Sequence, residues 1–79
     1  MAKRKRDRYD QFYSSRAWAA IRAIMLFCYR TCRNDPTHPG PFEVDHITPI
    51  SEFWEGRLRL TNLQVLCIPC HIRKHHPGT

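Results

Sequence analysis

Two close pairs of cysteines, Cys28 with Cys32 and Cys67 with Cys70, constrain this chain more than any other feature. A chain of 79 residues buries only a modest core, and domains of this size often need a metal ion or disulfide bonds to hold them together. The spacers of three and two residues fall within the range that zinc sites use. Because four thiolates form a closed tetrahedral site, we expect one structural Zn²⁺ that joins two distant segments of the chain.

The first residues bear on the competing interpretation, in which the cysteines form two disulfide bonds in a secreted domain. The chain is basic after Ala2 and stays polar to Gln11, so it lacks the apolar stretch of a signal peptide. Its longest apolar run is far shorter than a membrane span. We therefore expect a cytoplasmic protein with no membrane partner, in which cysteines stay reduced and favour zinc.

Basic residues give the chain a formal net charge of +6. Residues 3–8 alone carry five positive charges and one negative charge, without apolar periodicity. We expect a flexible basic arm over residues 1–11 and a single folded domain over residues 12–79. The charge favours nucleic acid as the partner, although a solubilising tail or a membrane-surface tether would have a similar composition. The side chains expected to contact DNA phosphates are Lys3, Arg4, Lys5, Arg6, Arg8, Arg57, Arg59, Arg73 and Lys74.

The folded part begins with an alanine-rich stretch that predicts a helix. Ser14 or Ser15 is a suitable N-cap, and the helical pattern continues to Phe27 or Cys28. We expect this helix to build the core, with Trp18 as a core anchor rather than a platform for stacking bases. The expected apolar face comprises Trp18, Ile21, Ile24, Met25, Phe27 and Cys28.

Two short strands and a second helix follow a loop over residues 33–41 that contains three prolines and a glycine. His38 lies in this loop, where a solvated histidine is a more common finding than a metal ligand. Residues 42–47 and 63–66 have the composition of strands, and the last helix is expected to carry residues 70–76. The order helix, strand, strand, helix predicts a small α+β domain.

Three side chains are of the kinds that bind a catalytic metal ion. His71 and His75 lie four residues apart on the predicted last helix, so they share one face and can bind one ion. Asp45 would add a carboxylate, and three protein ligands leave positions open for water and a phosphate oxygen. His46 is then the candidate general base, because a neutral imidazole accepts a proton near pH 7. Adjacent strand residues point to opposite faces, so we expect a strand end or a bulge that lets Asp45 and His46 serve one site.

These residues, in this order, resemble the HNH endonuclease family, the ββα-metal nucleases. The resemblance rests on Asp45 with His46, on Asn62, and on His71 directly after a C-x-x-C pair. It covers about residues 12–76, which is most of the chain.

The resemblance implies a fold, an activity and a set of roles. The fold is a small zinc-stapled ββα-metal fold with an additional N-terminal helix, and residues 13–18 also resemble small HNH proteins of phages and prophages. The activity is hydrolysis of DNA phosphodiester bonds, in which His46 activates water and Asn62 holds the ββα loop and helps align the base. The residues implied to hold the catalytic ion, which is Mn²⁺, Mg²⁺ or Ni²⁺, are Asp45, His71 and His75.

Two other function classes stay open. A zinc-stabilised module that binds DNA without cleaving it needs only the cysteines and the basic arm. An accessory subunit of a phage DNA-packaging machine, working beside a terminase in a bacterial or phage-infected cell, would have weak activity of its own. For the nuclease we expect a monomer or weak dimer that nicks one strand, with low sequence specificity because no recognition helix is evident.

Overall fold

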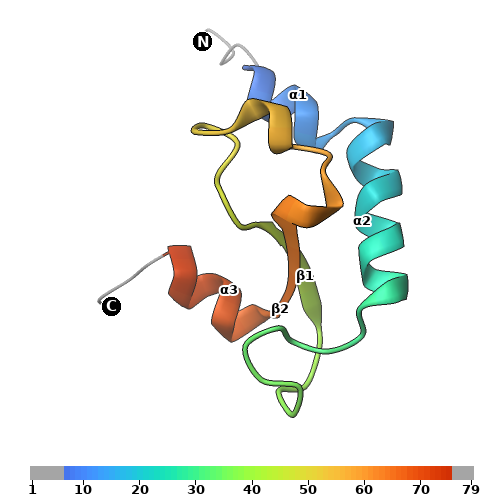
Figure 1. The fold of residues 1–79 in the computed structure, drawn as a ribbon, viewed down its shortest axis with the longest axis vertical. Helices are drawn as coiled ribbons and strands as arrows, with labels where there is room; N and C mark the ends of the chain where they lie inside the picture. The colour runs from blue at the N-terminus through green and yellow to red at the C-terminus, as the bar shows by residue number, and fades with distance from the viewer. Residues whose placement is uncertain (1–6, 76–79) are drawn as a thin grey trace, which may run out of the picture.

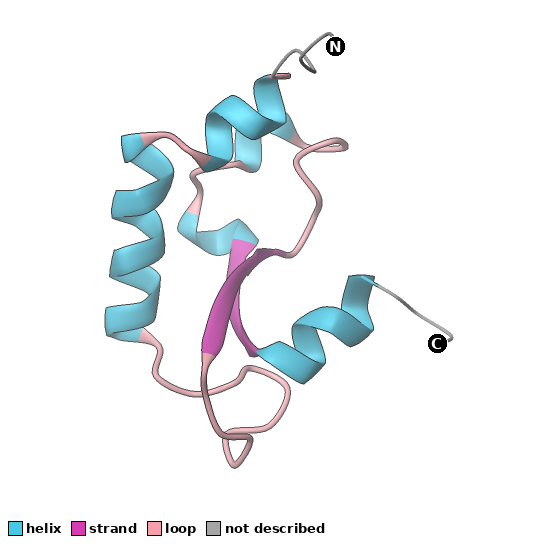
Figure 2. Ribbon diagram, turned by 180° about the vertical axis from the view of Figure 1, so that it is seen from behind, coloured by secondary structure: helices cyan, strands magenta, loops and turns pink. Residues whose placement is uncertain are grey.

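The computed structural model of the chain describes residues 7–75, which form a two-stranded antiparallel sheet between helices (Figure 1). Helix α2 (Arg16–Cys28) runs along one side of the sheet and α3 (Ile68–His75) lies on the other side, as the opposite view also shows (Figure 2). The predicted α+β class is confirmed, and the predicted order helix, strand, strand, helix is found from residue 16 onward, after one further helix. The elements are α1 (Arg8–Tyr13), α2 (Arg16–Cys28), β1 (Phe42–His46), the 3₁₀ turns η1 (Trp54–Gly56) and η2 (Leu60–Asn62), β2 (Leu63–Cys67) and α3 (Ile68–His75).

Helix α2 begins where the sequence predicts. Its N-cap is Ser15, whose hydroxyl accepts a hydrogen bond of 3.1 Å from the backbone N–H of Trp18. Trp18 and Met25 are buried against the sheet, so Trp18 is the core anchor that the pattern indicated. The prediction that Ile24 and Phe27 extend this buried face is wrong, because 46% of Ile24 and 71% of Phe27 are exposed.

Helix α1 corrects the boundary expected for the N-terminal arm. Asp7 caps this helix by accepting a hydrogen bond of 2.9 Å from the backbone N–H of Asp10. Phe12 is buried and contacts the rings of Trp18 and Trp54. Residues 8–11 are therefore helical rather than a flexible arm, because burial of the aromatic side chains of α1 holds them in place. The basic residues before Asp7 lie outside the described part of the chain.

The two strands pair in one continuous register from Phe42 opposite Cys67 to His46 opposite Leu63. Within β1 and β2 this register contains no bulge, so of the two expected alternatives, a strand end or a bulge, the bulge is wrong. Adjacent side chains of β1 therefore point to opposite faces. His46 points toward the core beside α1 and α2, whereas Asp45 points toward α3.

Helix α3 follows β2 without a connecting loop. Pro69 is its second residue, where the missing backbone N–H has no intrahelical partner to lose. Cys70 is buried against the sheet, and the basic residues of the last turn suit the negative end of the helix dipole. Among residues 7–75, no helix has the length and apolar content needed to span a membrane.

Candidate metal centres and active site

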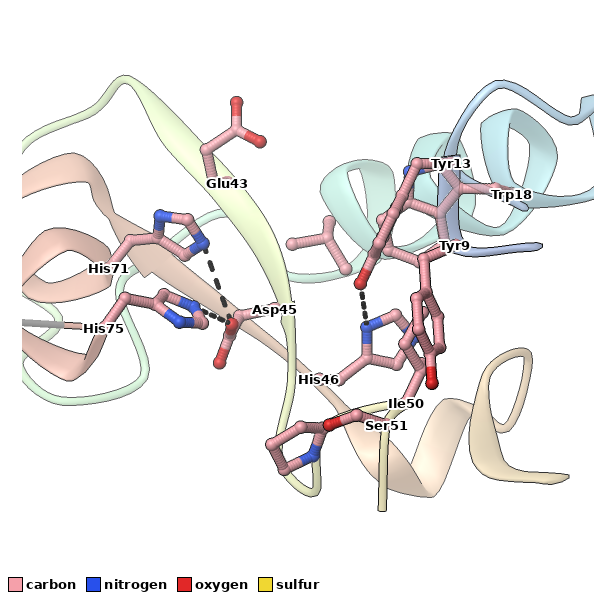
Figure 3. A pocket seen from close by; sticks show the side chains of 12 residues that line it. Tyr9, Tyr13, Trp18, Glu43, Asp45, His46, Ile50, Ser51, His71 and His75 are labelled. Carbon is pink, nitrogen blue, oxygen red and sulfur yellow. Dashed lines mark hydrogen bonds and ion pairs between the residues drawn. The ribbon is translucent and has the colours of Figure 1, made fainter. Parts of the chain in front are cut away.

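Asp45 and two histidines converge between β1 and α3 (Figure 3). Asp45 is buried, with 4% of its side chain exposed, whereas His71 and His75 lie one turn apart on α3. The Nε2 atoms of His75 and His71 lie 2.9 and 3.7 Å from Oδ1 of Asp45. One ligand atom from each residue lies within 4.8 Å of the other two. The structure thus brings together the three side chains that the sequence predicted for the catalytic ion.

The donor set fits a divalent ion with open coordination positions. Two imidazoles and one carboxylate suit Mn²⁺ or Ni²⁺, and they bind Mg²⁺ less readily. About a third of the His71 side chain and half of the His75 side chain are exposed, so one side of the set faces solvent. Water and a substrate oxygen have room to approach from that side.

Two further residues hold Asp45 in place. Gln64, which pairs with Asp45 across the sheet, donates a hydrogen bond of 3.0 Å to Oδ2. The ammonium group of Lys74 also contacts Oδ2 and the backbone carbonyl of His46. Burial by itself would raise the pKa of Asp45, but the hydrogen bonds from Lys74, Gln64 and His75 outweigh it and hold that pKa below its usual value. The carboxylate is therefore ionised at neutral pH, and Oδ1 is left facing the histidines.

Neither of these supporting roles was predicted. We expected Lys74 to contact DNA phosphate, but its side chain turns inward to Asp45 instead. Gln64 went unnoticed, although a polar residue in the middle of an apolar strand was a signal in the sequence.

Replacing His71 or His75 with alanine is expected to weaken Mn²⁺ binding by more than about 100-fold, because even outer-shell partners of a metal contribute 10- to 100-fold. Isothermal titration calorimetry on the zinc-loaded protein measures this affinity. Ile72→Ala is the matched control, since Ile72 lies between the two histidines on α3 and is 53% exposed. Unchanged affinity in His71→Ala would remove His71 from the ligand set.

His46 lies on the other face of β1, buried among aromatic rings of α1 and α2 (Figure 3). Its ring stacks on Trp18, with centroids 5.1 Å apart and an interplanar angle of 23°. Nε2 lies 2.9 Å from the backbone carbonyl oxygen of Arg57, and Nδ1 lies 3.2 Å from the hydroxyl of Tyr13. Both ring nitrogens thus have a partner within the described part of the chain.

One open cleft of about 510 Å³ connects the two faces of β1. Its lining includes Asp45, His71 and His75 on one side and His46 with Tyr13 on the other. The candidate base and the candidate metal ligands therefore share a cleft even though their strand positions point apart. The end of β1 at His46 makes this possible, which is the first of the two solutions that the sequence suggested.

Asn62 organises the loop between the strands. Its side-chain oxygen accepts a hydrogen bond of 2.9 Å from the N–H of Thr48, and its Nδ2 donates to the carbonyls of Thr48 and Gly56 at 3.1 and 3.3 Å. A Cβ atom at Gly56 would lie 2.9 Å from Nδ2 of Asn62 and 2.3 Å from the ring of Phe53, so glycine is required there. Asn62 thus holds the loop that carries Arg57, the backbone partner of His46, and contacts backbone groups rather than the His46 ring.

Asn62→Ala is expected to lower the free energy of unfolding by about 2–4 kcal/mol, because it leaves the buried carbonyl of Gly56 and the partly buried backbone groups of Thr48 without these partners. Chemical denaturation of the zinc-loaded protein measures the change. Thr61→Ala, at the exposed neighbouring position, should stay within about 0.5 kcal/mol of the parent. Equal effects from the two substitutions would contradict this role for Asn62.

The second cluster of possible metal ligands corrects our expected zinc site. It comprises Cys32, His38, Cys67 and Cys70, with one ligand atom from each within 4.8 Å of the others. Cys28 ends α2, is exposed, and is not part of the cluster. The α-helix continues through Cys28, so its thiol cannot turn toward the site as a looser chain would allow. The loop residue His38, which we expected to be solvated, takes the fourth position instead.

The geometry of this cluster fits a structural zinc ion. His38 Nδ1 lies 3.4 Å from the sulfur of Cys70 and 3.6 Å from that of Cys67, and a tetrahedron with Zn–S bonds of about 2.3 Å separates its ligand atoms by roughly 3.8 Å. Nε2 of His38 faces the Asp35 carboxylate at 3.6 Å, an arrangement that orients metal-bound histidines. Three thiolates and one imidazole form a closed set typical of structural Zn²⁺.

The cluster favours a thiolate at Cys32, whereas the pKa of Cys67 is raised: the backbone N–H of Cys70 lowers it, but burial and the sulfurs of Cys70 and Cys32 outweigh that effect. Burial opposes ionisation, but hydrogen bonds from backbone N–H groups, including that of Cys67, and from His38 lower the pKa of Cys32 from 9.0 to about 6. Since the folded-state pKa is depressed, the resulting stabilisation of the metal-free fold is fully present above pH 9 and is lost as the pH falls through about 6. Cys32 is therefore mostly a thiolate at neutral pH, which is the form that binds a metal ion.

The predicted phosphate-binding residues are spread unevenly over the described part of the chain. The guanidinium carbons of Arg8 and Arg57 lie 4.3 and 4.5 Å from the centre of the Trp54 ring. Arg59 lies over Phe53, at 5.5 Å, and Arg73 is exposed on α3. That these four contact DNA phosphates stays a prediction. Lys3, Arg4, Lys5 and Arg6 lie outside the described residues.

The sequence profile of the HNH endonuclease family matches residues 27–77, which is more than half of the chain. The chain belongs to the HNH endonuclease family. Among solved structures, it resembles the crystal structure, with manganese ion, of the HNH endonuclease of the deep-sea thermophilic bacteriophage GVE2. The two are 36% identical over 86% of this chain and 78% of that chain, with a TM-score of 0.75. Comparison with curated protein sequences gave no match.

Membership of the HNH endonuclease family makes this chain a DNA-hydrolysing enzyme and confirms the predicted fold. The matched segment of the HNH endonuclease profile starts at Phe27. It contains both clusters of possible metal ligands, whereas α1 and nearly all of α2, which surround His46, precede it.

Proposed function

We propose that this protein is a metal-dependent endonuclease that nicks DNA, with His46 as the general base and a divalent ion on Asp45, His71 and His75. The observation that carries the proposal is the shared cleft, which His46 lines together with the three candidate ligands. A module that only bound DNA would have no need of a buried imidazole facing the same cleft as a carboxylate and two histidines.

The hydrogen bonds of His46 define which atom accepts the proton. A backbone carbonyl only accepts, so Nε2 must donate its hydrogen to the carbonyl of Arg57 at 2.9 Å. In the neutral ring Nδ1 then holds the lone pair, which contacts the hydroxyl of Tyr13 at 3.2 Å here and takes the proton of the attacking water once that water has displaced the hydroxyl. Burial against Trp18 keeps the ring in this orientation.

The other residues of the cleft position the phosphodiester. Asp45, held by Gln64 and Lys74, presents Oδ1 together with the two imidazoles of α3. When bound there, a divalent ion supplies stabilisation for the negative charge of the transition state and of the leaving 3′ oxygen. Neighbouring phosphates fit the cationic groups of Arg8 and Arg57 beside Trp54.

Zinc is proposed for the Cys32, His38, Cys67 and Cys70 site, with a structural role. The set offers no open position for substrate, and three thiolates favour zinc over the harder ions that suit the Asp45 site. Its ligands connect the loop between α2 and β1 to the β2–α3 junction, so the ion would hold the helix that carries His71 and His75.

Nicking rather than double-strand cleavage follows from one catalytic cleft per chain. No described element inserts a row of side chains into a DNA groove, so we propose low sequence specificity. A partner protein, such as a component of a phage DNA-packaging machine, would then supply any targeting.

Cleavage of supercoiled plasmid tests the proposal. Zinc-loaded protein is incubated with plasmid in buffer stripped of divalent ions and in the same buffer with added Mn²⁺, Mg²⁺ or Ni²⁺. We expect conversion to the open circular form before the linear form, only with added ion. Absence of cleavage with every ion, together with salt-sensitive DNA binding, would overturn the enzyme proposal for the isolated chain and favour a binding module or accessory subunit.

A further inference from the structure

The edge of β2 that faces away from β1 is open over a short stretch. In an antiparallel pair, residues that bond across the sheet alternate with residues whose backbone groups point outward. The hydrogen bond of 2.8 Å from the N–H of Ile47 to the carbonyl of Asn62 fixes the phase of this alternation. The backbone groups of Leu63 and Val65 therefore point away from β1.

Each of these two residues has one outward group engaged and one open. The N–H of Leu63 donates to the carbonyl of Leu60, and the carbonyl of Val65 accepts a hydrogen bond of 2.8 Å from the N–H of Arg33. The carbonyl of Leu63 and the N–H of Val65 have no hydrogen-bond partner among residues 7–75. Unpaired backbone groups at a sheet edge are a template for a further strand.

The two open groups match one residue of a parallel strand. In parallel pairing, a residue donates to the carbonyl before its neighbour and accepts from the N–H after it. A residue beside Gln64 would thus donate to Leu63 and accept from Val65. An antiparallel strand instead needs both the N–H and the carbonyl of one residue, and neither Leu63 nor Val65 offers both. Two copies of this chain related by a twofold axis would pair their β2 edges antiparallel, so this edge does not suit a symmetric dimer.

A groove of about 410 Å³ runs along this edge. Met25, Tyr29 and Leu60 contribute to its walls, and half or more of the surface of Tyr29 and Leu60 is exposed. Among the described residues that line it, Arg33 alone is charged. The groove is also separate from the catalytic cleft, because no described residue lines both.

We propose that the β2 edge binds an extended acidic segment of a partner protein, which adds a strand parallel to β2. Alternate apolar side chains of that segment would face Met25 and Leu60, and an acidic one would face Arg33. The backbone of Arg33 closes the edge after Val65, so only about three residues of the segment pair with β2.

Charge and hydrogen bonding favour an acidic peptide over the other occupants. The net charge of +6 disfavours a second copy of the chain and any basic segment. The sugar–phosphate backbone of DNA carries no donor for the carbonyl of Leu63, whereas a peptide backbone supplies a donor and an acceptor. Because the groove and the cleft are separate, the partner could bind while DNA occupies the cleft.

The first measurement uses a defined peptide, acetyl-Val-Thr-Val-Asp-Glu-amide, and the zinc-loaded protein labelled with ¹⁵N. We expect the largest changes of amide chemical shift at Val65 and Arg33, and slower exchange of the Val65 N–H with solvent. A spin label on the carboxyl end of the peptide should broaden Arg33 more than Leu60, and a label on the amino end should do the reverse. This order identifies a parallel strand.

The second measurement separates the backbone contribution from the charge. N-methylation of the threonine removes the donor to the carbonyl of Leu63, and we expect affinity to fall by more than about tenfold. Arg33→Glu should weaken binding of the acidic peptide about tenfold or more and should favour acetyl-Val-Thr-Val-Lys-Lys-amide instead. Arg16→Glu is the matched control, because Arg16 is exposed at the start of α2 and does not line the groove.

The possible failures are distinct. Unchanged Val65 signals at millimolar peptide, equal binding of the N-methylated peptide, or the reverse order of broadening would overturn the proposal. So would shifts of Val65 that depend on protein concentration alone, which would assign the edge to a second copy, or displacement of the peptide by a single-stranded oligonucleotide at Val65, which would assign it to DNA. Plasmid nicking should stay within about twofold when the peptide is bound, and a parent that nicks nothing would remove the proposed function while the peptide spectra still decide this one.

Discussion

Replacing His46 with alanine is expected to lower the rate of metal-dependent plasmid nicking by about 10²–10⁴-fold, the usual contribution of a general base. The structure explains why no neighbouring side chain would replace His46 as the base. The ring is buried, and its only nitrogen lone pair is on Nδ1, because Nε2 donates to the carbonyl of Arg57. Initial rates of open-circle formation, measured at saturating Mn²⁺, provide the comparison.

Alanine leaves a cavity beside Trp18, so loss of activity must be separated from loss of the fold. His46→Gln keeps more of the volume and cannot act as a base near pH 7, and both variants should retain one zinc and parental Mn²⁺ affinity. Nicking by folded His46→Gln at more than a tenth of the parental rate would contradict the assignment of His46.

Replacing Cys32 with serine is expected to remove the bound zinc and to unfold the domain. Structural zinc contributes on the order of 10 kcal/mol to small metal-dependent domains, which exceeds the roughly 3–5 kcal/mol that the core of a chain this short supplies. Cys32 is 1% exposed and has the depressed pKa of a metal-ready thiol. Zinc content by elemental analysis and the folded fraction by circular dichroism report the two effects.

Cys28→Ser is the matched comparison, because it makes the same chemical change four residues earlier. Cys28 is exposed at the end of α2, so we expect parental zinc content and parental stability. Loss of zinc from Cys28→Ser, with retention in His38→Ala, would restore the four-cysteine site that the spacing alone suggested.

The parts of the site that follow from local periodicity could be predicted. His71 and His75 share a face because they lie four residues apart on a helix, and the order of strand and helix brings Asp45 to them. The position of His38 could not, since a proline-rich loop has no periodicity from which to infer direction. Cys28 was misassigned because we gave the C-x3-C spacing more weight than the helical pattern, which already reached Cys28 and which the structure confirms.

Contacts between segments that are distant in the sequence could not be predicted either. Tyr13 and Trp18 reach His46 only because α1 and α2 fold back over the sheet, and the residues near His46 in the sequence do not indicate that packing. Gln64 faces Asp45 because of the strand register, which the sequence leaves open until the pairing is known. In both cases the missing information was tertiary rather than chemical.

Helix α3 supplies neighbouring residues, Cys70 and His71, to two different ion sites. A helix of eight residues moves as a rigid unit, so ordering it at one site prepares it for the other. Thermodynamic linkage then requires reciprocity: zinc raises the affinity of the second ion by the same factor by which that ion raises the affinity for zinc. The activity of such an enzyme would follow the zinc supply of its surroundings as well as the ion that serves its chemistry.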